Sequence, residues 1–300
     1  MAQGKGAGPC RGGARRRQSA LSVAPSSLSA AACGVLETAE PAEKVARSTA
    51  IAALWRAGGI AETGAATPPL RPARPARPIL LAPRAMPKRR AGGSPEGRVA
   101  LLHALAHIEL NAIDLAWDII ARFADAARPR DFYDDWVGVA AEEAKHHALL
   151  VARLAELGAA YGDLPAHDGL WQAAQATAHD LLARLAVVPL VLEARGLDVT
   201  PEMIRRFERL GDAASAAVLR VIYADEIGHV AVGRRWFLAL CAARGLAPEP
   251  TYHALVRRYF KGALKPPFNR AGRDAAGFPA AFYEPLAMAA RSRLDQVDRR

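Results

Sequence analysis

The sequence predicts an all-α protein built on a four-helix bundle, and three observations carry this prediction. Hydrophobic residues make up 51% of the 300-residue chain and aromatic residues 6%, a balance that favours packed helices over a β-sandwich. Four long segments show helical periodicity and are separated by short stretches that contain glycine or proline. Two of these segments carry the same Glu-x-x-His motif, which places both side chains on one face of a helix.

Residues 1–36 are expected to form a disordered basic leader. They contain no acidic residue and are rich in Ala, Gly, Ser and Arg, a composition that is too poor in large apolar residues to bury a core. The segment resembles an organelle transit peptide superficially, and an overlong start in an Ala/Arg-rich chain is the favoured interpretation.

Residues 37–96 are expected to hold one helix and a proline-rich strap. The helix covers residues 37 to about 60, with Pro41 near its start and two glycines at its end. From Thr67 to Pro87, repeated prolines forbid a helix and favour an extended backbone. A free linker would satisfy this composition too, but the apolar residues 79–81 would let an ordered strap bury side chains against the bundle.

The bundle and a C-terminal extension are expected to occupy residues 97–300. Ser94 and Pro95 form a helix start, with serine as the cap and proline at the first helical position. The four long helices are expected at 94–127, 131–157, 169–194 and 200–244, the last with a break near Gly211. Two shorter helices are expected at 250–262 and 280–296, with a proline-containing loop at 265–269 between them.

Charge, cysteine usage and hydropathy exclude several classes of protein. The net charge is +10, but residues 1–98 carry a balance of +11 and residues 99–300 a balance of −1, which disfavours nucleic acid as a partner of the body. Three widely spaced cysteines argue against a zinc site or a disulfide framework and fit a reducing cytoplasm. The most apolar stretch, residues 181–192, is about half the roughly 20 residues that span a bilayer, so no membrane association is expected.

The candidate chemistry lies in a pattern that occurs twice. Glu143 and His146 form one Glu-x-x-His motif, and Glu226 and His229 form the other. Each motif follows a lone glutamate on the preceding expected helix, 34 residues earlier in the first case and 33 in the second. A helical pair repeated about a pseudo-two-fold axis would bring six side chains to the centre of the bundle, namely Glu109, Glu143, His146, Glu193, Glu226 and His229.

These six residues are the predicted ligands of two metal ions. Four glutamates neutralise the four positive charges of two divalent ions, and two imidazoles complete the site without adding charge. An oxygen-rich, nitrogen-poor set suits iron or manganese and disfavours a structural zinc site. Glu193 follows the most apolar stretch of the chain, where an unpaired carboxylate would cost several kcal/mol.

Other polar residues near the motifs have open roles at this stage. Glu142 and Asp225 each precede a predicted ligand and point about 100° away from it, so each is either an acceptor behind the ligands or an exposed acid. Tyr223 lies one turn before Glu226 and is either a phenol near the metals or a core residue. Packing or capping is expected for His103 and His107, and His147 is expected to be exposed. Asn269 and Arg273 are either polar contacts to a substrate or, as the favoured interpretation, ordinary surface residues.

Several longer motifs resemble one family. They are HALAHIELNAIDLAWD (103–118), EEAKHHALL (142–150), LEARGLDVTP (192–201), YADEIGHVAVG (223–233) and YFKGALKPPFN (259–269). With RPARP and RAMPKRRAGGSPEGR in the strap, they resemble the ferritin-like family catalogued as domain of unknown function 455 over residues 38–290. The resemblance implies a ferritin-like bundle and the same six ligands, but no substrate, because the family has no settled activity. More distantly, the chain resembles the non-haem di-iron tRNA hydroxylases.

The function expected from the motifs is that of a non-haem di-iron or di-manganese carboxylate protein. It would activate O₂ to oxidise an unknown small molecule, with electrons from a donor protein, in the cytoplasm. One alternative is a non-catalytic protein of the same fold that stores or handles metal or serves as a scaffold. Another is a tRNA-modifying hydroxylase, against which the near-neutral body argues.

Overall fold

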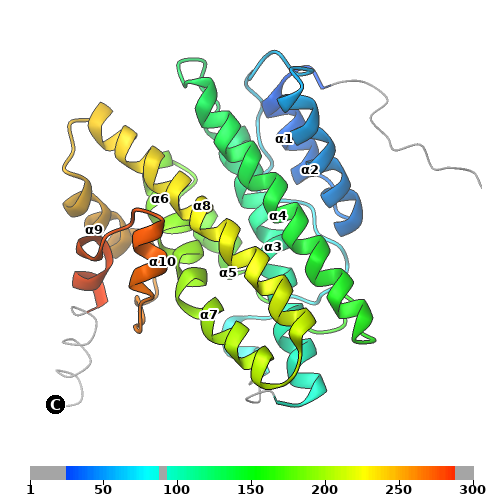
Figure 1. Ribbon diagram of the computed structural model, residues 1–300. Helices are drawn as coiled ribbons and strands as arrows, with labels where there is room; N and C mark the ends of the chain where they lie inside the picture. Colours follow the sequence, from blue (N-terminus) through cyan, green and yellow to red (C-terminus); the bar gives the residue numbers. More distant parts are fainter. Residues whose placement is uncertain (1–24, 88–92, 288–300) are drawn as a thin grey trace, which may run out of the picture.

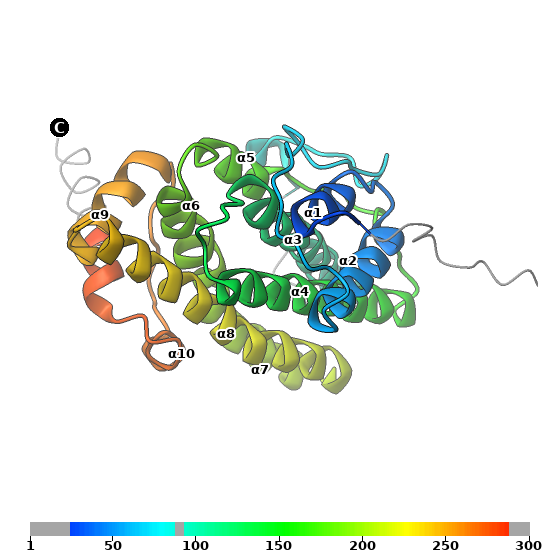
Figure 2. The same cartoon turned by 90° about the horizontal axis from the view of Figure 1, so that it is seen from above.

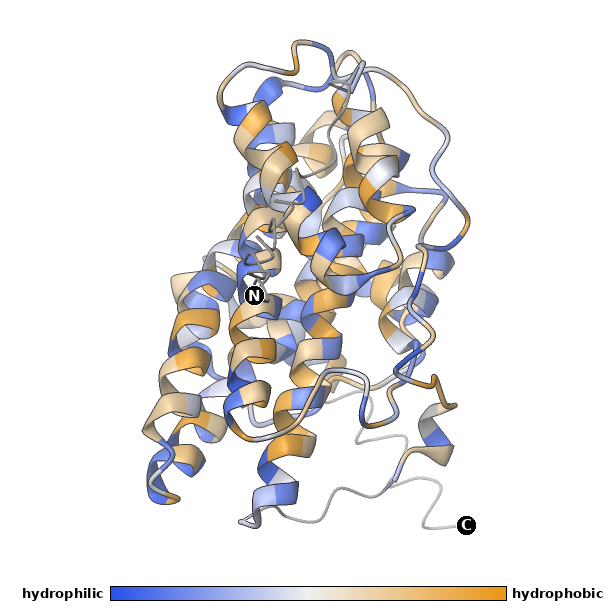
Figure 3. Cartoon of the chain, turned by 90° about the vertical axis from the view of Figure 1, so that its right-hand side faces the viewer, coloured by the Kyte–Doolittle hydropathy of each residue, from blue (hydrophilic) through white to orange (hydrophobic). Residues whose placement is uncertain are grey.

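The computed structural model describes residues 25–87 and 93–287, and within these ranges the protein is all-α, as predicted (Figure 1). The extended backbone of the described residues forms a single isolated parallel bridge, between Leu80 and Ala166. Figure 3 shows apolar and polar residues alternating around the helices, so that each helix can bury one face.

Four long helices form the centre of the molecule: α3 (Pro95–Arg122), α4 (Arg130–Glu156), α7 (Ala194–Arg209) and α8 (Ala213–Ala243). Helix α3 packs along α4, α7 packs along α8, and contacts between α4 and α8 join the two pairs. The backbones of α3 and α7 stay further apart, and side chains such as Leu102 and Phe207 fill part of the space between them.

Local signals explain where these helices begin and end. The Ser94 side chain accepts a hydrogen bond from the Gly97 N–H at the start of α3, and the Asp212 side chain accepts one from the Ser215 N–H at the start of α8. Gly211, at φ +71°, supplies the left-handed turn between α7 and α8, where the break was predicted.

The segment before α7 differs from its prediction. Instead of one helix over 169–194, the chain forms α5 (Gly169–Ala176), α6 (Leu181–Val187) and a π-helical segment, η2 (Val188–Glu193). The break before α6 arises because Asp180 caps that helix through the Leu182 N–H.

Helix α7 continues directly from η2, so the predicted end of one helix at residue 194 and the predicted start of the next at residue 200 are wrong. A proline inside a helix leaves the carbonyl four residues earlier without a donor. Here that carbonyl belongs to Leu197, and it accepts a hydrogen bond of 3.0 Å from the Asn269 side-chain amide. The helix tolerates Pro201 because a distant loop replaces the missing N–H.

The expectation of disorder up to residue 36 is also wrong for the part that the structure describes. Residues 28–36 form α1 (Leu28–Leu36), which turns into α2 (Pro41–Arg56), and this hairpin packs on α3 and α4. The Ser27 side chain caps α1, and large apolar residues such as Leu28 and Val35 are fully buried. The rest of the expected leader lies outside the described residues.

The strap crosses from the hairpin to α3 and contains a short 3-10 turn, η1 (Pro83–Ala85). The expectation that apolar residues anchor the strap is wrong for Ile79, because this side chain is 61% exposed. Polar contacts hold the strap instead: Arg74 bonds to both Asp114 and Asn111 of α3. The Leu81 N–H donates to the Ala166 carbonyl at 2.8 Å, which adds a backbone link.

The C-terminal helices lie at the opposite side of the bundle from the hairpin, as Figures 1 and 2 both show. They are α9 (Pro248–Tyr259), α10 (Arg270–Ala275) and a helical stretch at 280–287; the remainder of the helix expected at 280–296 lies outside the described residues.

Two residues of this region are candidate substrate contacts, and both have structural roles. Arg273 is 2% exposed, pairs with Asp198 and lies 4.2 Å over the Tyr283 ring. Asn269 caps α10 by accepting from the Gly272 N–H and also bonds to the Leu197 carbonyl described above. Both side chains are thus bonded within the protein, and their contact with a substrate stays a prediction.

Helix α3 is long and apolar enough to cross a membrane. Residues 181–192, the most apolar stretch of the sequence, do not form such a helix. Most of the apolar window of α3 is buried inside the molecule, as in the core helix of a soluble protein.

Candidate metal centre

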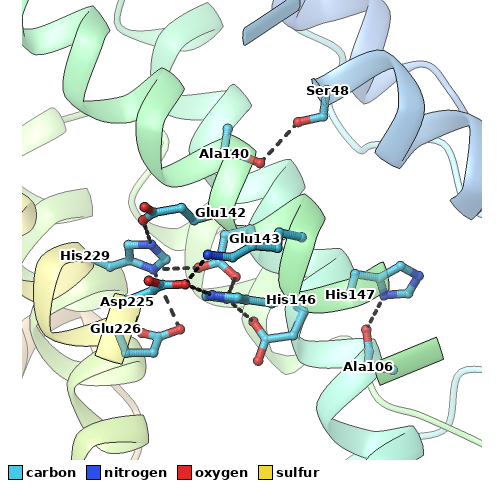
Figure 4. Close-up of polar contacts among 12 residues, drawn as sticks. Ser48, Ala106, Ala140, Glu142, Glu143, His146, His147, Asp225, Glu226 and His229 are labelled. Atoms are coloured by element: carbon cyan, nitrogen blue, oxygen red, sulfur yellow. Dashed lines mark hydrogen bonds and ion pairs between the residues drawn. The ribbon is translucent and has the colours of Figure 1, made fainter. Parts of the chain in front are cut away.

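Four elements bring the predicted ligands together. Helix α3 supplies Glu109, η2 supplies Glu193, and the Glu-x-x-His motifs lie on α4 and α8. Ligand atoms of four of these residues lie within 4.8 Å of one another, and all four residues are buried: Glu109, Glu143, His146 and Glu226. His229 is buried too, at 1% exposure, and Figure 4 shows it beside Glu143 and His146.

Both histidines direct their Nδ1 atoms at the carboxylates. His146 Nδ1 lies 3.3 Å from Glu143 Oε2 and 3.8 Å from Glu109 Oε2. His229 Nδ1 lies 3.0 Å from Glu143 Oε1 and 3.7 Å from Glu226 Oε1. Glu143 therefore stands between the two imidazoles and is shared by both halves of the cluster.

The other nitrogen of each ring is held by an acid from the opposite motif (Figure 4). His146 Nε2 on α4 lies 2.9 Å from Asp225 Oδ2 on α8, and His229 Nε2 on α8 lies 2.8 Å from Glu142 Oε2 on α4. An imidazole that donates its Nε2 proton to a carboxylate keeps an Nδ1 lone pair for a metal. Of the two roles left open by the sequence, the structure thus favours acceptors behind the ligands for Glu142 and Asp225. Lys145, which also pairs with Asp225, was missed by the sequence analysis.

Glu193 joins the cluster through η2. A π-helical turn adds a residue to the backbone repeat, and such turns occur often at functional sites. Proline 189 of this segment packs against Gly233 of α8, where a Cβ would lie 2.4 Å from the proline ring. This close approach lets Glu193 line a cavity together with Glu109, Glu143 and Glu226.

Several inward-facing atoms of the cluster lack a hydrogen-bond partner among the described residues. They are Glu193 Oε2 and Glu226 Oε2, together with Glu143 Oε1 and His229 Nδ1, which lie 3.0 Å apart but are not aligned for a hydrogen bond. Leaving a buried polar atom unpaired costs about 1–3 kcal/mol, and more for a charged group. Such atoms in a buried cluster of carboxylates and imidazoles are accounted for when a cation binds among them.

The ionisation of the cluster follows from its burial and crowding. Burial and the neighbouring carboxylate of Glu143 raise the pKa of Glu109 well above its ordinary value, and burial with Glu226 does the same to the pKa of Glu193. Burial works to lower the pKa of His146, but hydrogen bonds to Glu109 and Glu143 outweigh it and raise that pKa to about 10. Protons thus balance the charge when no cation is bound, and a cation that enters has to displace them.

The donor set fits a metal ion. Carboxylate oxygens outnumber imidazole nitrogens in the cluster. The Nδ1 atom of each imidazole faces the carboxylates, and its Nε2 atom is bonded to Asp225 or Glu142. This buried cluster could therefore hold metal.

The remaining histidines near the motifs do not contribute to the cluster. His103 accepts a hydrogen bond from the Gly162 N–H at 2.9 Å, and His107 Nδ1 lies 2.9 Å from the Tyr161 hydroxyl, which agrees with the expected packing roles. The expectation that His147 is exposed is wrong, because it is 2% exposed and donates from Nδ1 to the Ala106 carbonyl (Figure 4). Tyr223 accepts a hydrogen bond from Asn269 rather than contacting a ligand.

Two comparisons find proteins similar to this chain. A family model described as "Protein of unknown function (DUF455)" matches residues 37–284. A Haemophilus influenzae relative described as an uncharacterized protein is 44% identical over 213 residues, which cover 68% of this chain and 72% of the relative. No solved structure matches this chain.

Proposed function

This chain belongs to the DUF455 family, as its motifs predicted, and we propose that it is a non-haem di-iron carboxylate protein that activates O₂ to oxidise a small molecule. Manganese could replace one or both irons with the same ligands. In this proposal α3, α4, α7 with η2, and α8 form a ferritin-like bundle, and the two halves of the repeated motif each contribute three ligands.

The observation that carries the proposal is the buried cluster of carboxylates and imidazoles, whose four glutamates line an apolar cavity. Glu109, Glu143, Glu193 and Glu226 would hold and charge-balance two ions, and His146 and His229 would complete their coordination. Two irons would supply the redox chemistry of O₂ in the balance R–H + O₂ + 2 e⁻ + 2 H⁺ → R–OH + H₂O, with a one-electron donor protein as the external reductant.

The protein's own groups have distinct tasks in this chemistry. Asp225 and Glu142 hold the imidazole Nε2 protons and so fix both rings with Nδ1 inward. The apolar cavity beside the glutamates keeps bulk water away from the reacting carbon atom.

The test is metal content per chain in anaerobically purified protein, followed by the absorption spectrum after O₂ is added. We expect about two irons per chain and a new oxo-bridged ferric band. Glu143→Ala and Glu226→Ala should lose the metal, because each removes a central carboxylate, whereas the exposed control Glu202→Ala should keep it. No stoichiometric metal after Fe(II) loading would remove the proposal and leave a helical scaffold.

Bound iron that reacts with O₂ but never supports oxidation of an organic molecule would favour the alternative of metal storage or handling. Oxidation of a tRNA base would instead identify the tRNA-modifying alternative.

A further inference from the structure

An apolar cavity of about 150 Å³ lies directly against the cluster. Its floor is formed by the four glutamates, and neither histidine lines it. Its walls come from α3, α5, η2, α7 and α8, and include Leu105, Ala112, Leu115, Leu192 and Met203. An aliphatic cavity of about 150 Å³ accepts a benzene-sized molecule, so this one admits an apolar group of roughly six to eight non-hydrogen atoms.

The cavity is bounded by α3 and α7, the two long helices whose backbones stay apart. Ile108, at 41% exposure, marks the α3 side, and Arg195 and Gly196 in the first turn of α7 mark the other. A second hollow of about 190 Å³ adjoins it and shares Leu192 and Arg195 with it. Arg195 therefore stands between the inner cavity and an outer hollow.

Arg195 shares its acid, Asp198, with a second arginine, Arg273. The Asp198 carboxylate lies 3.5 Å from its Nη1, but it already accepts two hydrogen bonds from Arg273, at 2.9 and 2.8 Å. The second contact of Arg195 is a 2.7 Å hydrogen bond to the Lys265 carbonyl, also from Nη1. Among the described residues, Nε and Nη2 are left for a ligand, and the exposed Lys265 lines the same outer hollow.

We propose that the substrate is a small amphipathic anion whose compact apolar body fills the inner cavity and whose anionic group binds Arg195. The orientation follows from polarity, because the guanidinium attracts the anionic group while the aliphatic walls of the inner cavity favour the apolar body. The apolar end is thereby presented to the glutamates. That this ligand is a substrate rests on the proposed function, whereas its binding does not.

The first test measures binding of linear alkanesulfonates from four to ten carbons to the purified, metal-containing protein by calorimetry. Sulfonates coordinate metals poorly, so their affinity reports on the cavity and Arg195. We expect affinity to rise about fourfold per added CH₂ while the chain enters the cavity and to level off near six to eight carbons. Affinity that is independent of chain length would overturn the cavity assignment.

The second test assigns the anion site. Arg195→Gln should weaken hexane-1-sulfonate about tenfold or more and change the binding of neutral 1-hexanol less than about twofold. Arg205→Gln is the matched control, since Arg205 lies on the same helix and pairs with Glu202 at a similar spacing. Equal losses for the sulfonate and the alcohol, or no loss for either, would overturn the role of Arg195.

The third test fills the cavity with Ala112→Leu, which should weaken both probes about tenfold. If this variant does not fold, the chain-length series in the unmodified protein still decides the point. Metal content of the same samples separates the two proposals. Probe binding without metal would contradict only the di-iron function, and metal without probe binding would contradict only the present inference.

Discussion

At the scale of single residues, two acids that do not face the candidate metal centre fix the orientation of its histidine rings. Asp225 and Glu142 each immediately precede a presumed ligand, and each holds the histidine of the other motif. The clustering of the candidate residues could be predicted because their spacing repeats in the sequence, and their role as ligands stays a prediction. The crossed pairing could not be predicted, because it depends on how α4 and α8 are aligned, which no local pattern encodes.

Replacing these acids tests their orienting role. Asp225→Asn and Glu142→Gln keep size and hydrogen bonding but remove the charge, and we expect each to weaken metal binding about 10- to 100-fold without unfolding the protein. Metal affinity is measured by competition with a chelator. Glu156→Gln, at an exposed position of α4, is the control, and equal affinities for all three variants would show that the acids do not support the ligands.

At the scale of elements, the π-helical segment η2 joins the apolar core to the centre. Sequence reasoning recovered α3, α4 and α8 within a few residues because their apolar repeats and caps are local. It misplaced the region from 169 to 201, because the break before α6 and the continuity through Pro201 depend on a side-chain cap and on Asn269, which is distant in sequence. Helix α1 was missed because a short apolar run behind a serine cap was set aside with the basic leader.

At Gly233, α8 lies in close contact with η2. An added Cβ would lie 2.4 and 2.6 Å from Pro189 side-chain atoms, so we expect Gly233→Ala to push η2 away and destabilise the protein by about 1–3 kcal/mol. Metal content should fall as Glu193 moves. Gly228→Ala on the same helix is the control, since nothing lies within 4 Å of its added Cβ, and it should stabilise the helix by up to about 1 kcal/mol. Both quantities come from urea unfolding and metal analysis; an unchanged Gly233→Ala variant would contradict the packing argument.

At the scale of the whole molecule, buried charges on α3 tie distant segments to the core. Asp114 pairs with Lys44 of α2 and Arg74 of the strap, and Asp118 pairs with Arg184 of α6 at 2.6 Å. A buried acid that loses its partner costs several kcal/mol, so the hairpin and strap should unfold together with the bundle. The sequence could not predict these pairs, because no motif or repeated spacing links their members.

Two buried histidines lower stability in acid because they resist protonation, whereas the raised pKa values of Glu109 and Glu193 act in the opposite direction over part of the same pH range. Burial lowers the pKa of His107 to about 3 and that of His147 to about 4, against about 6.5 in an unfolded chain. Below pH 6.5 the unfolded chain therefore binds protons that the native protein does not. Each histidine then removes about 1.4 kcal/mol of unfolding free energy per pH unit, down to about pH 3 for His107 and pH 4 for His147.

Urea unfolding from pH 7 to 4.5, in the presence of a chelator, measures this slope. We expect the unfolding free energy of His147→Leu, relative to that of the unmodified protein, to rise by about 1.4 kcal/mol per pH unit as the pH falls below 6.5. The exposed His179 provides the control variant, His179→Leu. A slope that stays the same in His147→Leu would show that this residue is not the origin of the acid sensitivity.

Because of the crossed pairs between α4 and α8, metal binding at the centre also depends on how the two halves of the protein are aligned. Each imidazole takes its orientation from the opposite helix, so a slip of one helix along the other would misdirect both rings at once. Metal occupancy should consequently be cooperative: the first ion captured would lock the alignment that the second requires, and protein molecules would be found with two ions or none.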